Sequence, residues 1–293
     1  MIEVTLAAGV SVLLGSGWYL AVRALPHADP AATASHRVGA NLAEQPRVRR
    51  FLRARVDPQT ATGLALTLAL LAVFIAAVVL GVLVAMIRGH GGVVNVDVAV
   101  TRWAATHATS FSLNVFGAIT WAGSTIVVVA VSVGTAVYGA HRWRTWPVVL
   151  FFVVVVGGQL LLSNAAKLAV ARVRPDEPPF HLVSGPSFPS GHATAAAATW
   201  TAVALVLGRG ASVRVRAVLA GVAAAIAVAV ACSRVFLGAH WMSDVVGGLL
   251  LGWTWFGVCA VAFGGRVLRL GAPVREATDA PSKPADRSDT RAA

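Results

Sequence analysis

Long apolar runs separated by short polar segments constrain the fold of this chain more than any other feature. A helix needs about 20 mostly apolar residues to cross the roughly 30 Å hydrocarbon core of a bilayer. Runs of this kind occupy residues 2–22, 63–87, 113–139, 146–168, 192–208, 213–232 and 244–264. The sequence therefore predicts an all-α integral membrane protein with seven spans.

The composition agrees with this fold class. In a chain of 293 residues, 57% hydrophobic and 12% charged residues do not fit a soluble globule. The two cysteines, Cys232 and Cys259, lie at different depths of two predicted helices, so we expect no disulfide between them. Both are interpreted as small apolar residues of the helix packing.

The first run, 2–22, has two interpretations. A cleaved signal peptide is one, since Ala32, Thr33 and Ala34 offer a small-residue cleavage site after it. A signal peptide begins with positive charge, however, and this run begins with Glu3 and no basic residue. We therefore expect a retained N-terminal transmembrane anchor.

Arginines gather in the connections that a seven-span chain places on one side of the membrane, which should be the cytoplasm. The formal net charge of +12 therefore reflects orientation, and without a helical basic stripe or interleaved aromatics we expect no nucleic-acid partner. These arginines are Arg23, Arg37, Arg47, Arg49, Arg50, Arg53, Arg55, Arg142, Arg144, Arg209, Arg214, Arg216, Arg266 and Arg269.

Two further segments complete the predicted organisation. Residues 23–62 mix Pro, Ala and Arg and are expected to form a basic cytoplasmic linker. Residues 265–293 are rich in Pro, Asp, Arg and Ser without apolar periodicity, which predicts a disordered cytoplasmic tail. The membrane domain is then 63–264, and the outer face is expected to hold the amino terminus, residues 88–112, residues 169–191 and the turn between the last two spans.

The sequence KLAVARVRP ends the fourth predicted span with several cations. Lys167 and Arg174 are seven residues apart, about two helical turns, so they share a face if the helix continues that far. Pro175 ends the span. The alternative is that these side chains snorkel towards lipid headgroups, and we interpret Arg172 in that way.

The sequence SFPSGHATAA begins the fifth predicted span. Ser190 is a natural N-cap, and the free backbone N–H groups of Gly191 and His192 lie where the helix dipole favours an anion. Gly191 has no side chain, so an oxyanion can approach the backbone closely. The alternative is an ordinary capped helix.

The sequence SRVFLGAHWMSD joins the last two spans. His240 and Asp244 are four residues apart, so the carboxylate can hold one imidazole nitrogen and leave the other free to attack. Arg234 carries a planar fork of donors suited to phosphate oxygens. The alternative is an interfacial His–Asp pair beside a lipid-facing Trp241. Together, the three motifs indicate a site for a phosphate ester.

These motifs resemble the three-part signature of the phosphatidic acid phosphatase type 2 superfamily: a lysine, six residues and Arg-Pro; Pro-Ser-Gly-His; and Ser-Arg, five residues, His, three residues and Asp. All fixed positions are present in order. The resemblance covers about residues 63–264 and implies a core of six transmembrane helices, to which the run 2–22 adds one.

The resemblance also implies the roles of individual residues. His240 would form a phosphohistidine, Asp244 would orient His240, and His192 would protonate the leaving oxygen and then activate water. It implies no metal ion and no other cofactor, and Asp176 and Glu177 are interpreted as solvated loop residues. The expected ligands of the phosphoryl oxygens are Lys167, Arg174, Ser190, Gly191 and Arg234.

The resulting hypothesis is a metal-independent lipid phosphate phosphatase of a bacterial plasma membrane, with its site on the extracytoplasmic side. Phosphatidic acid, phosphatidylglycerophosphate and polyprenyl diphosphate are all plausible substrates. A phosphotransferase that passes the phosphoryl group to another lipid or a sugar is the main alternative. A vanadate haloperoxidase is disfavoured by the apolar spans, and a transporter or scaffold with a dead site by the presence of both histidines.

Overall fold

The computed structural model describes residues 61–89, 91–176 and 185–263, and within these ranges every regular element is helical. The predicted anchor 2–22, nearly all of the linker 23–62 and the tail 265–293 lie outside them. The elements are α4 (Ala61–Arg88), α5 (Gly92–His107), α6 (Ser110–Thr120), the 3-10 turn η1 (Trp121–Gly123), α7 (Thr125–Trp143), α8 (Pro147–Val170), α9 (Gly191–Leu207), α10 (Val213–Phe236) and α11 (Met242–Phe263).

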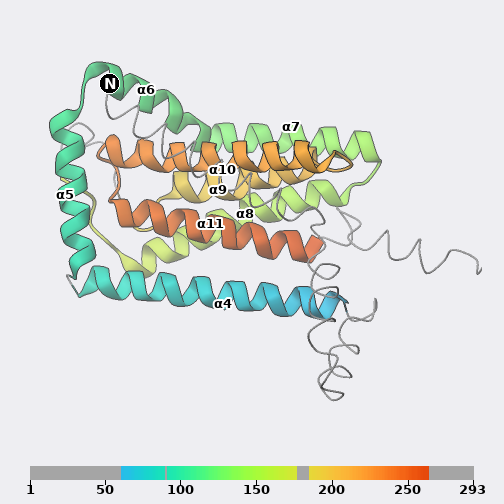
Figure 1. Ribbon diagram of the computed structural model, residues 1–293, viewed down its shortest axis with the longest axis horizontal. Coiled ribbons are helices and arrows are strands. Elements are labelled where there is room, and N and C mark those ends of the chain that lie inside the picture. Colours follow the sequence, from blue (N-terminus) through green and yellow to red (C-terminus); the bar gives the residue numbers. More distant parts are fainter. Residues whose placement is uncertain (1–60, 90, 177–184, 264–293) are drawn as a thin grey trace, which may run out of the picture.

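Six long helices, α4 and α7 to α11, run side by side and form the body of the protein (Figure 1). Among the described residues, five of these helices are long and apolar enough to cross a membrane. The sixth, α9, is a shorter apolar helix of 17 residues that packs against α7, α8, α10 and α11. The structure thus confirms the six-helix transmembrane core.

Small residues allow α9 to occupy the centre of the bundle. Six of its eleven buried residues are alanines, and two glycines of α11 face it. A Cβ on Gly252 would lie 2.4 Å from the carbonyl oxygen of Thr194, and one on Gly248 would lie 2.7 Å from that of Ser190. Without those side chains the two backbones pack closely, as small residues permit between membrane helices.

The prediction of one continuous span over 113–139 was wrong. The chain turns at η1, and α7 begins again after Ser124, whose hydroxyl accepts a hydrogen bond from the Val127 amide at 3.3 Å. At Gly123 a Cβ would lie 2.8 Å from the carbonyl oxygen of His192, so the turn packs directly onto the start of α9. This contact between distant segments breaks an apolar run that looks continuous in the sequence.

Two helices lie at one end of the bundle. In Figure 1, α5 runs across the helix ends and α6 leads from it back to α7. At this end α8 and α10 finish and α9 and α11 begin. Residues 88–112, expected on the outer face without an assigned structure, therefore include a helix that covers four converging helix ends.

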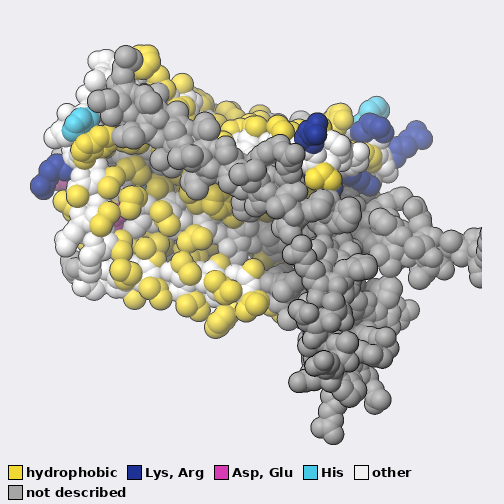
Figure 2. All heavy atoms as spheres, viewed as in Figure 1, with side chains coloured by type: hydrophobic (Ala, Val, Ile, Leu, Met, Phe, Trp, Pro, Cys, Tyr) yellow, Lys and Arg dark blue, Asp and Glu magenta, His cyan; other side chains and the backbone are white. Residues whose placement is uncertain are grey.

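The surface fits a protein embedded in lipid. Hydrophobic side chains cover the middle of the visible face, and Lys and Arg gather towards the two ends (Figure 2). Leu161 is 74% exposed and Ile126 is 71% exposed, which suits side chains that face lipid. The chain is a multi-pass membrane protein.

Candidate active site

The predicted site residues meet at the bundle end that α5 crosses. They come from the end of α8, the loop after it, the start of α9, the end of α10 and the start of α11. The structure brings all eight to this end: Lys167, Arg174, Ser190, Gly191, His192, Arg234, His240 and Asp244.

His240 lies in the turn between α10 and α11. Gly238 has φ of 67°, a left-handed conformation that suits glycine, and lets the chain reverse after α10. The His240 side chain is only 2% exposed, and its Nδ1 lies 3.5 Å from Oδ2 of Asp244. That separation is a close electrostatic contact, and Nδ1 makes no hydrogen bond of good geometry within the described residues.

Arg174 contacts the other ring nitrogen of His240. Its Nη1 lies 3.2 Å from His240 Nε2. Since a guanidinium only donates hydrogen bonds, Nε2 must accept, and the neutral ring then carries its proton on Nδ1, facing Asp244. Burial lowers the pKa of His240 to about 4; Asp244 opposes this shift, and Arg174 and Arg234 reinforce it. His240 is therefore neutral near pH 7.

Arg174 does not extend α8 as the helical-face prediction supposed. The helix ends at Val170, and Ala171 adopts a left-handed conformation with φ of 49°. Arg174 instead donates to the carbonyl oxygens of Gly185 at 3.0 Å, Pro186 at 3.3 Å and Ala239 at 2.7 Å. These bonds tie the loop after α8 to the turn that carries His240.

Lys167 and Gly191 face each other across the site. A Cβ on Gly191 would lie 3.7 Å from Nζ of Lys167, so the missing side chain leaves the start of α9 open towards the ammonium group. The charges of Lys167, Arg174 and Arg234, together with His240, act on His192 at close range. One small region thus holds three cations beside two histidines.

Two buried donors in this region have no partner within the described residues. Ser190 occupies the N-cap position of α9, but its hydroxyl makes no capping bond, contrary to the simple capping prediction. Arg234 donates from Nη1 to Oγ1 of Thr120 at 3.1 Å, whereas its Nε is unpaired. Unpaired buried donors cost free energy, so each of the two would gain from a bound acceptor such as an anion.

The interpretation of Arg172 as a snorkelling side chain was wrong. Its side chain is 10% exposed, and it pairs with two buried carboxylates, Asp97 of α5 and Asp244 of α11, each at 2.7 Å. The guanidinium also lies 5.3 Å from the centre of the Trp241 ring. Trp241 Nε1 donates to the Val173 carbonyl oxygen at 2.9 Å, so this indole is engaged in the site rather than simply facing lipid.

Three polar residues next to the site were missed from the sequence. Asp97 accepts from the Ser243 amide, and Ser187 Oγ donates to Asp244 Oδ2. A signal was present for Asp97, because a single carboxylate stands in the apolar run VVNVDVAV. Ser187 and Ser243 carry no comparable signal in the sequence.

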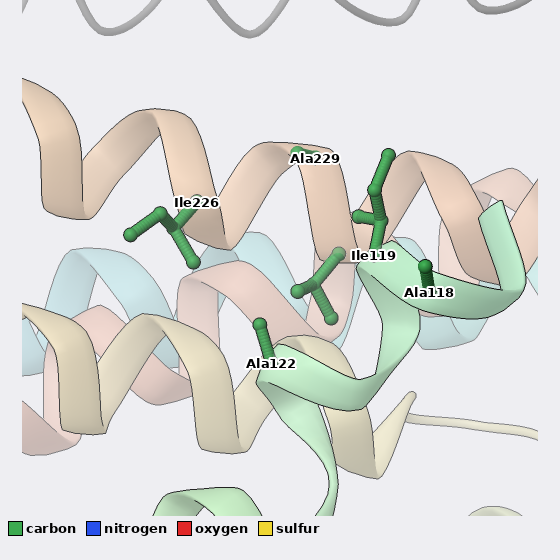
Figure 3. A pocket seen from close by; sticks show the side chains of 6 residues that line it. Ala118, Ile119, Ala122, Ile226 and Ala229 are labelled. Carbon is green, nitrogen blue, oxygen red and sulfur yellow. The ribbon is translucent and has the colours of Figure 1, made fainter. Parts of the chain in front are cut away.

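A shallow apolar groove of about 410 Å³ opens between α6–η1 and α10 (Figure 3). Thr120, the partner of Arg234, lies in the same segment as the groove residues, and Val230 precedes Arg234 by one helical turn. The groove is lined by Ala118, Ile119, Ala122, Ile226, Ala229 and Val230.

Within the described ranges, no group of three or more His, Cys, Asp and Glu side chains could hold a metal ion. Metal independence of the chemistry stays a prediction.

Comparison with known proteins gives consistent matches. Residues 147–267 match the model of the PAP2 superfamily. Phosphatidylglycerophosphatase B of Bacillus subtilis (strain 168) is 32% identical over 111 residues, 37% of this chain and 54% of that protein. Lipid A 1-phosphatase of Rhizobium johnstonii is 40% identical over 117 residues, 36% of this chain and 43% of that protein. This chain thus aligns with about half the length of these two relatives.

A solved structure is also similar. It is the crystal structure of a transmembrane PAP2 type phosphatidylglycerolphosphate phosphatase from Bacillus subtilis. The TM-score is 0.61 at 30% sequence identity, and the match covers 66% of this chain and 96% of that one.

Proposed function

Since this chain belongs to the PAP2 superfamily, we propose that it is an integral-membrane lipid phosphate phosphatase that works through a phosphohistidine. One observation carries the proposal: Lys167, Arg174 and Arg234 converge with two histidines at the ends of apolar helices. Phosphoryl transfer depends chiefly on positioning and on stabilising charge on the phosphoryl oxygens, which these cations supply.

Phosphate binding uses donors from four segments of the chain. Lys167, the Ser190 hydroxyl, the Gly191 amide and Arg234 Nε bind the phosphoryl oxygens. Arg174 joins them by turning Nη1 from His240 Nε2 to a phosphoryl oxygen, which also frees the nucleophile. The two unpaired donors, Ser190 Oγ and Arg234 Nε, support this assignment because a bound phosphate satisfies them.

The reaction has two displacements at phosphorus. His240 Nε2 attacks, a P–N bond forms, and the P–O bond to the lipid breaks as His192 gives its proton to the leaving oxygen. Water then attacks phosphorus while His192 takes back a proton, the P–N bond breaks, and inorganic phosphate leaves. Asp244 holds Nδ1 of His240 during both steps. No metal ion is required, since the side chains supply the positive charge.

A lipid substrate fits the position of the site. The site lies at the ends of membrane-length helices, so a headgroup can enter while its chains remain in the bilayer. The groove between α6–η1 and α10 is apolar along its length and approaches the Thr120–Arg234 contact, which suits one chain of that lipid. The substrate class is a phosphomonoester or diphosphate of a lipid, such as phosphatidic acid, phosphatidylglycerophosphate or polyprenyl diphosphate.

The membrane side follows from the arginines. Arg142, Arg144, Arg209, Arg214 and Arg216 lie in or beside the connections at the opposite end of the bundle from the site. By the positive-inside rule we infer that this end is cytoplasmic, which supports an extracytoplasmic site. We propose that the membrane is a bacterial plasma membrane.

The decisive experiment measures phosphate release by the purified full chain in detergent, with and without a chelator. The substrates are phosphatidic acid, phosphatidylglycerophosphate, polyprenyl diphosphate and a lipid A 1-phosphate. We expect release from at least one of them, no effect of the chelator, and near-total loss in His240→Ala. Acid-quenched protein should carry label from a ³²P-labelled substrate in the wild type and none in the variant.

Three results would overturn parts of the proposal. Activity that survives His240→Ala would show that His240 is not the nucleophile. Activity that requires a divalent ion would contradict the metal-free mechanism. Label that reaches an added lipid or sugar alcohol in preference to water identifies a phosphotransferase instead.

A further inference from the structure

Two fully buried carboxylates share one arginine next to the site. Asp97 and Asp244 are both 0% exposed, and Arg172 places Nη2 2.7 Å from Asp97 Oδ2 and Nη1 2.7 Å from Asp244 Oδ1. A buried carboxylate without a partner is costly, so each needs the shared guanidinium. Of these three residues, only Asp244 occupies a fixed position of the signature motifs.

Ser243 ties this arginine to the start of α11. Its amide donates to Asp97 Oδ1 at 2.8 Å and its hydroxyl to Asp97 Oδ2 at 2.5 Å, while Arg172 Nη1 donates to that hydroxyl at 2.6 Å. The first amides of a helix have no partner inside it. Asp97, on α5, therefore takes the part of an N-cap residue for α11, although it belongs to a different helix. Because Ser243 directly precedes Asp244, this cap also fixes the backbone of Asp244.

The two oxygens of Asp244 have separate partners. Oδ1 accepts from Arg172 at 2.7 Å. Oδ2 accepts from the Ser187 hydroxyl and from the Trp241 amide at 3.0 Å, and it faces His240 Nδ1. A carboxylate held through both oxygens cannot rotate without breaking one set of bonds. Oδ2 is thereby kept towards His240.

We propose that Arg172 and Asp97 are positioning residues: Asp97 holds Arg172 and Ser243, Arg172 and Ser243 hold Asp244, and Asp244 holds His240. Neither Arg172 nor Asp97 needs to touch the substrate. The kinetic consequence rests on the proposed phosphatase function, whereas the electrostatic consequence at His240 does not require any substrate.

The substrate-free test is the titration of His240, followed by NMR on protein labelled with ¹⁵N-histidine in detergent micelles, with His240→Gln to assign the signal. The charged and titratable groups that face His240 are Asp244, Arg174, Arg234 and His192. Burial places the wild-type pKa of His240 at about 4.

Removing the two positioning charges should affect this titration differently. Arg172→Gln removes a cation beside Asp244, so the protonated imidazole is stabilised and the pKa of His240 rises towards 6.5. Asp97→Asn removes an anion, so the pKa of His240 stays at or below the wild-type value. A merely structural role would loosen and hydrate the site and raise the pKa in both variants. A rise of the pKa of His240 in both variants, or no rise in Arg172→Gln, would overturn the proposal.

The kinetic test separates turnover from binding. Loss of a residue that orients a metal-binding histidine typically costs about 10- to 100-fold in affinity or activity, and by analogy we expect a fall in kcat of that order for Arg172→Gln. KM should change by less than about threefold, as should inhibition by inorganic phosphate, because the phosphate ligands are untouched. Since Asp97 and Arg172 act as a unit, the double variant should lose little more than the worse single variant.

Two further variants keep the test decisive. Ser243→Ala keeps every charge, so it should fold even where Arg172→Gln does not, and it should still lower kcat several-fold. Arg102→Gln removes an exposed arginine from the same helix as Asp97 and should match the wild type. Full kcat in Ser243→Ala and Arg172→Gln would overturn the proposal. A wild type that releases no phosphate would instead overturn the proposed function and leave the titration result standing.

Discussion

Arg174 donates from Nη1 to Nε2 of His240, across 3.2 Å. The contact fixes the tautomer of the histidine, because an arginine has no acceptor and Nε2 must supply the lone pair. The same lone pair is the one that would attack phosphorus. Under the proposed function, Arg174 would therefore align the nucleophile in this geometry and would have to release it when a phosphoryl group arrives.

Substitution of Arg174 should therefore affect binding and turnover together. Hydrogen bonds that involve a charged group contribute about 1.5–3 kcal/mol, so we expect Arg174→Gln to lower kcat/KM by roughly 10- to 100-fold. Arg174→Lys should recover little, because an ammonium lacks the planar fork that reaches Gly185, Pro186 and Ala239 at once. Steady-state kinetics on the best lipid substrate measures this, with Arg214→Gln, an exposed arginine at the other end of the bundle, as the control. Wild-type kcat/KM in Arg174→Lys would contradict a role for the fork.

Acid should destabilise the protein through His240. Burial lowers the folded-state pKa of His240 to about 4, against about 6.5 when unfolded, so the unfolded chain binds more protons between these values. Above pH 6.5 His240 is neutral in both states and does not lower the free energy of unfolding. As the pH drops towards 4, the free energy of unfolding falls by at most about 3 kcal/mol, because the unfolded chain binds the proton first. Thermal unfolding in detergent from pH 7.5 to 4 should show a smaller loss of Tm in His240→Gln than in the wild type. Parallel curves would contradict this prediction.

Filling the apolar groove should discriminate between substrates by chain length. Ala229→Phe places a ring in the space between Ala118 and Ile226, and KM for long-chain lipid phosphates should rise several-fold. A short-chain, water-soluble phosphomonoester should be hydrolysed as by the wild type, since the phosphate ligands are unchanged. Val222→Phe, on an exposed part of the same helix, is the matched control. An equal effect on both substrates would show that the groove does not hold the chain.

A single methyl group added to α11 where it packs closely on α9 should destabilise the protein. In Gly252→Ala the new Cβ meets the backbone of Thr194 at 2.4 Å, so the helices must separate, at a cost of roughly 1–3 kcal/mol. We expect a lower Tm in detergent and lower activity, because α9 and α11 carry His192 and Asp244. Gly257→Ala lies on the same helix with nothing within 4 Å of the new atom, and should be neutral or slightly stabilising. Equal melting temperatures for the two variants would contradict the packing argument.

Apart from the break before α7, the six core spans and the three motifs could be predicted from the sequence because both signals are local. An apolar run of sufficient length has to form a helix in a bilayer, where backbone groups find no water. His240 and Asp244 are close because they are four residues apart, and Ser190 to His192 begin α9 because that sequence favours a helix start. The roles assigned to these residues remain predictions.

Only the tertiary structure decided which distant residues meet. Arg172 and Asp97 are 75 residues apart, and Arg234 and Thr120 are 114 apart. The break before α7 depends on the contact of Gly123 with the start of α9. Such contacts depend on how loops return and how closely helices pack, which hydrophobic periodicity does not encode. An arginine near a helix end has the same sequence pattern whether it snorkels to lipid or, as Arg172 does, holds two buried carboxylates.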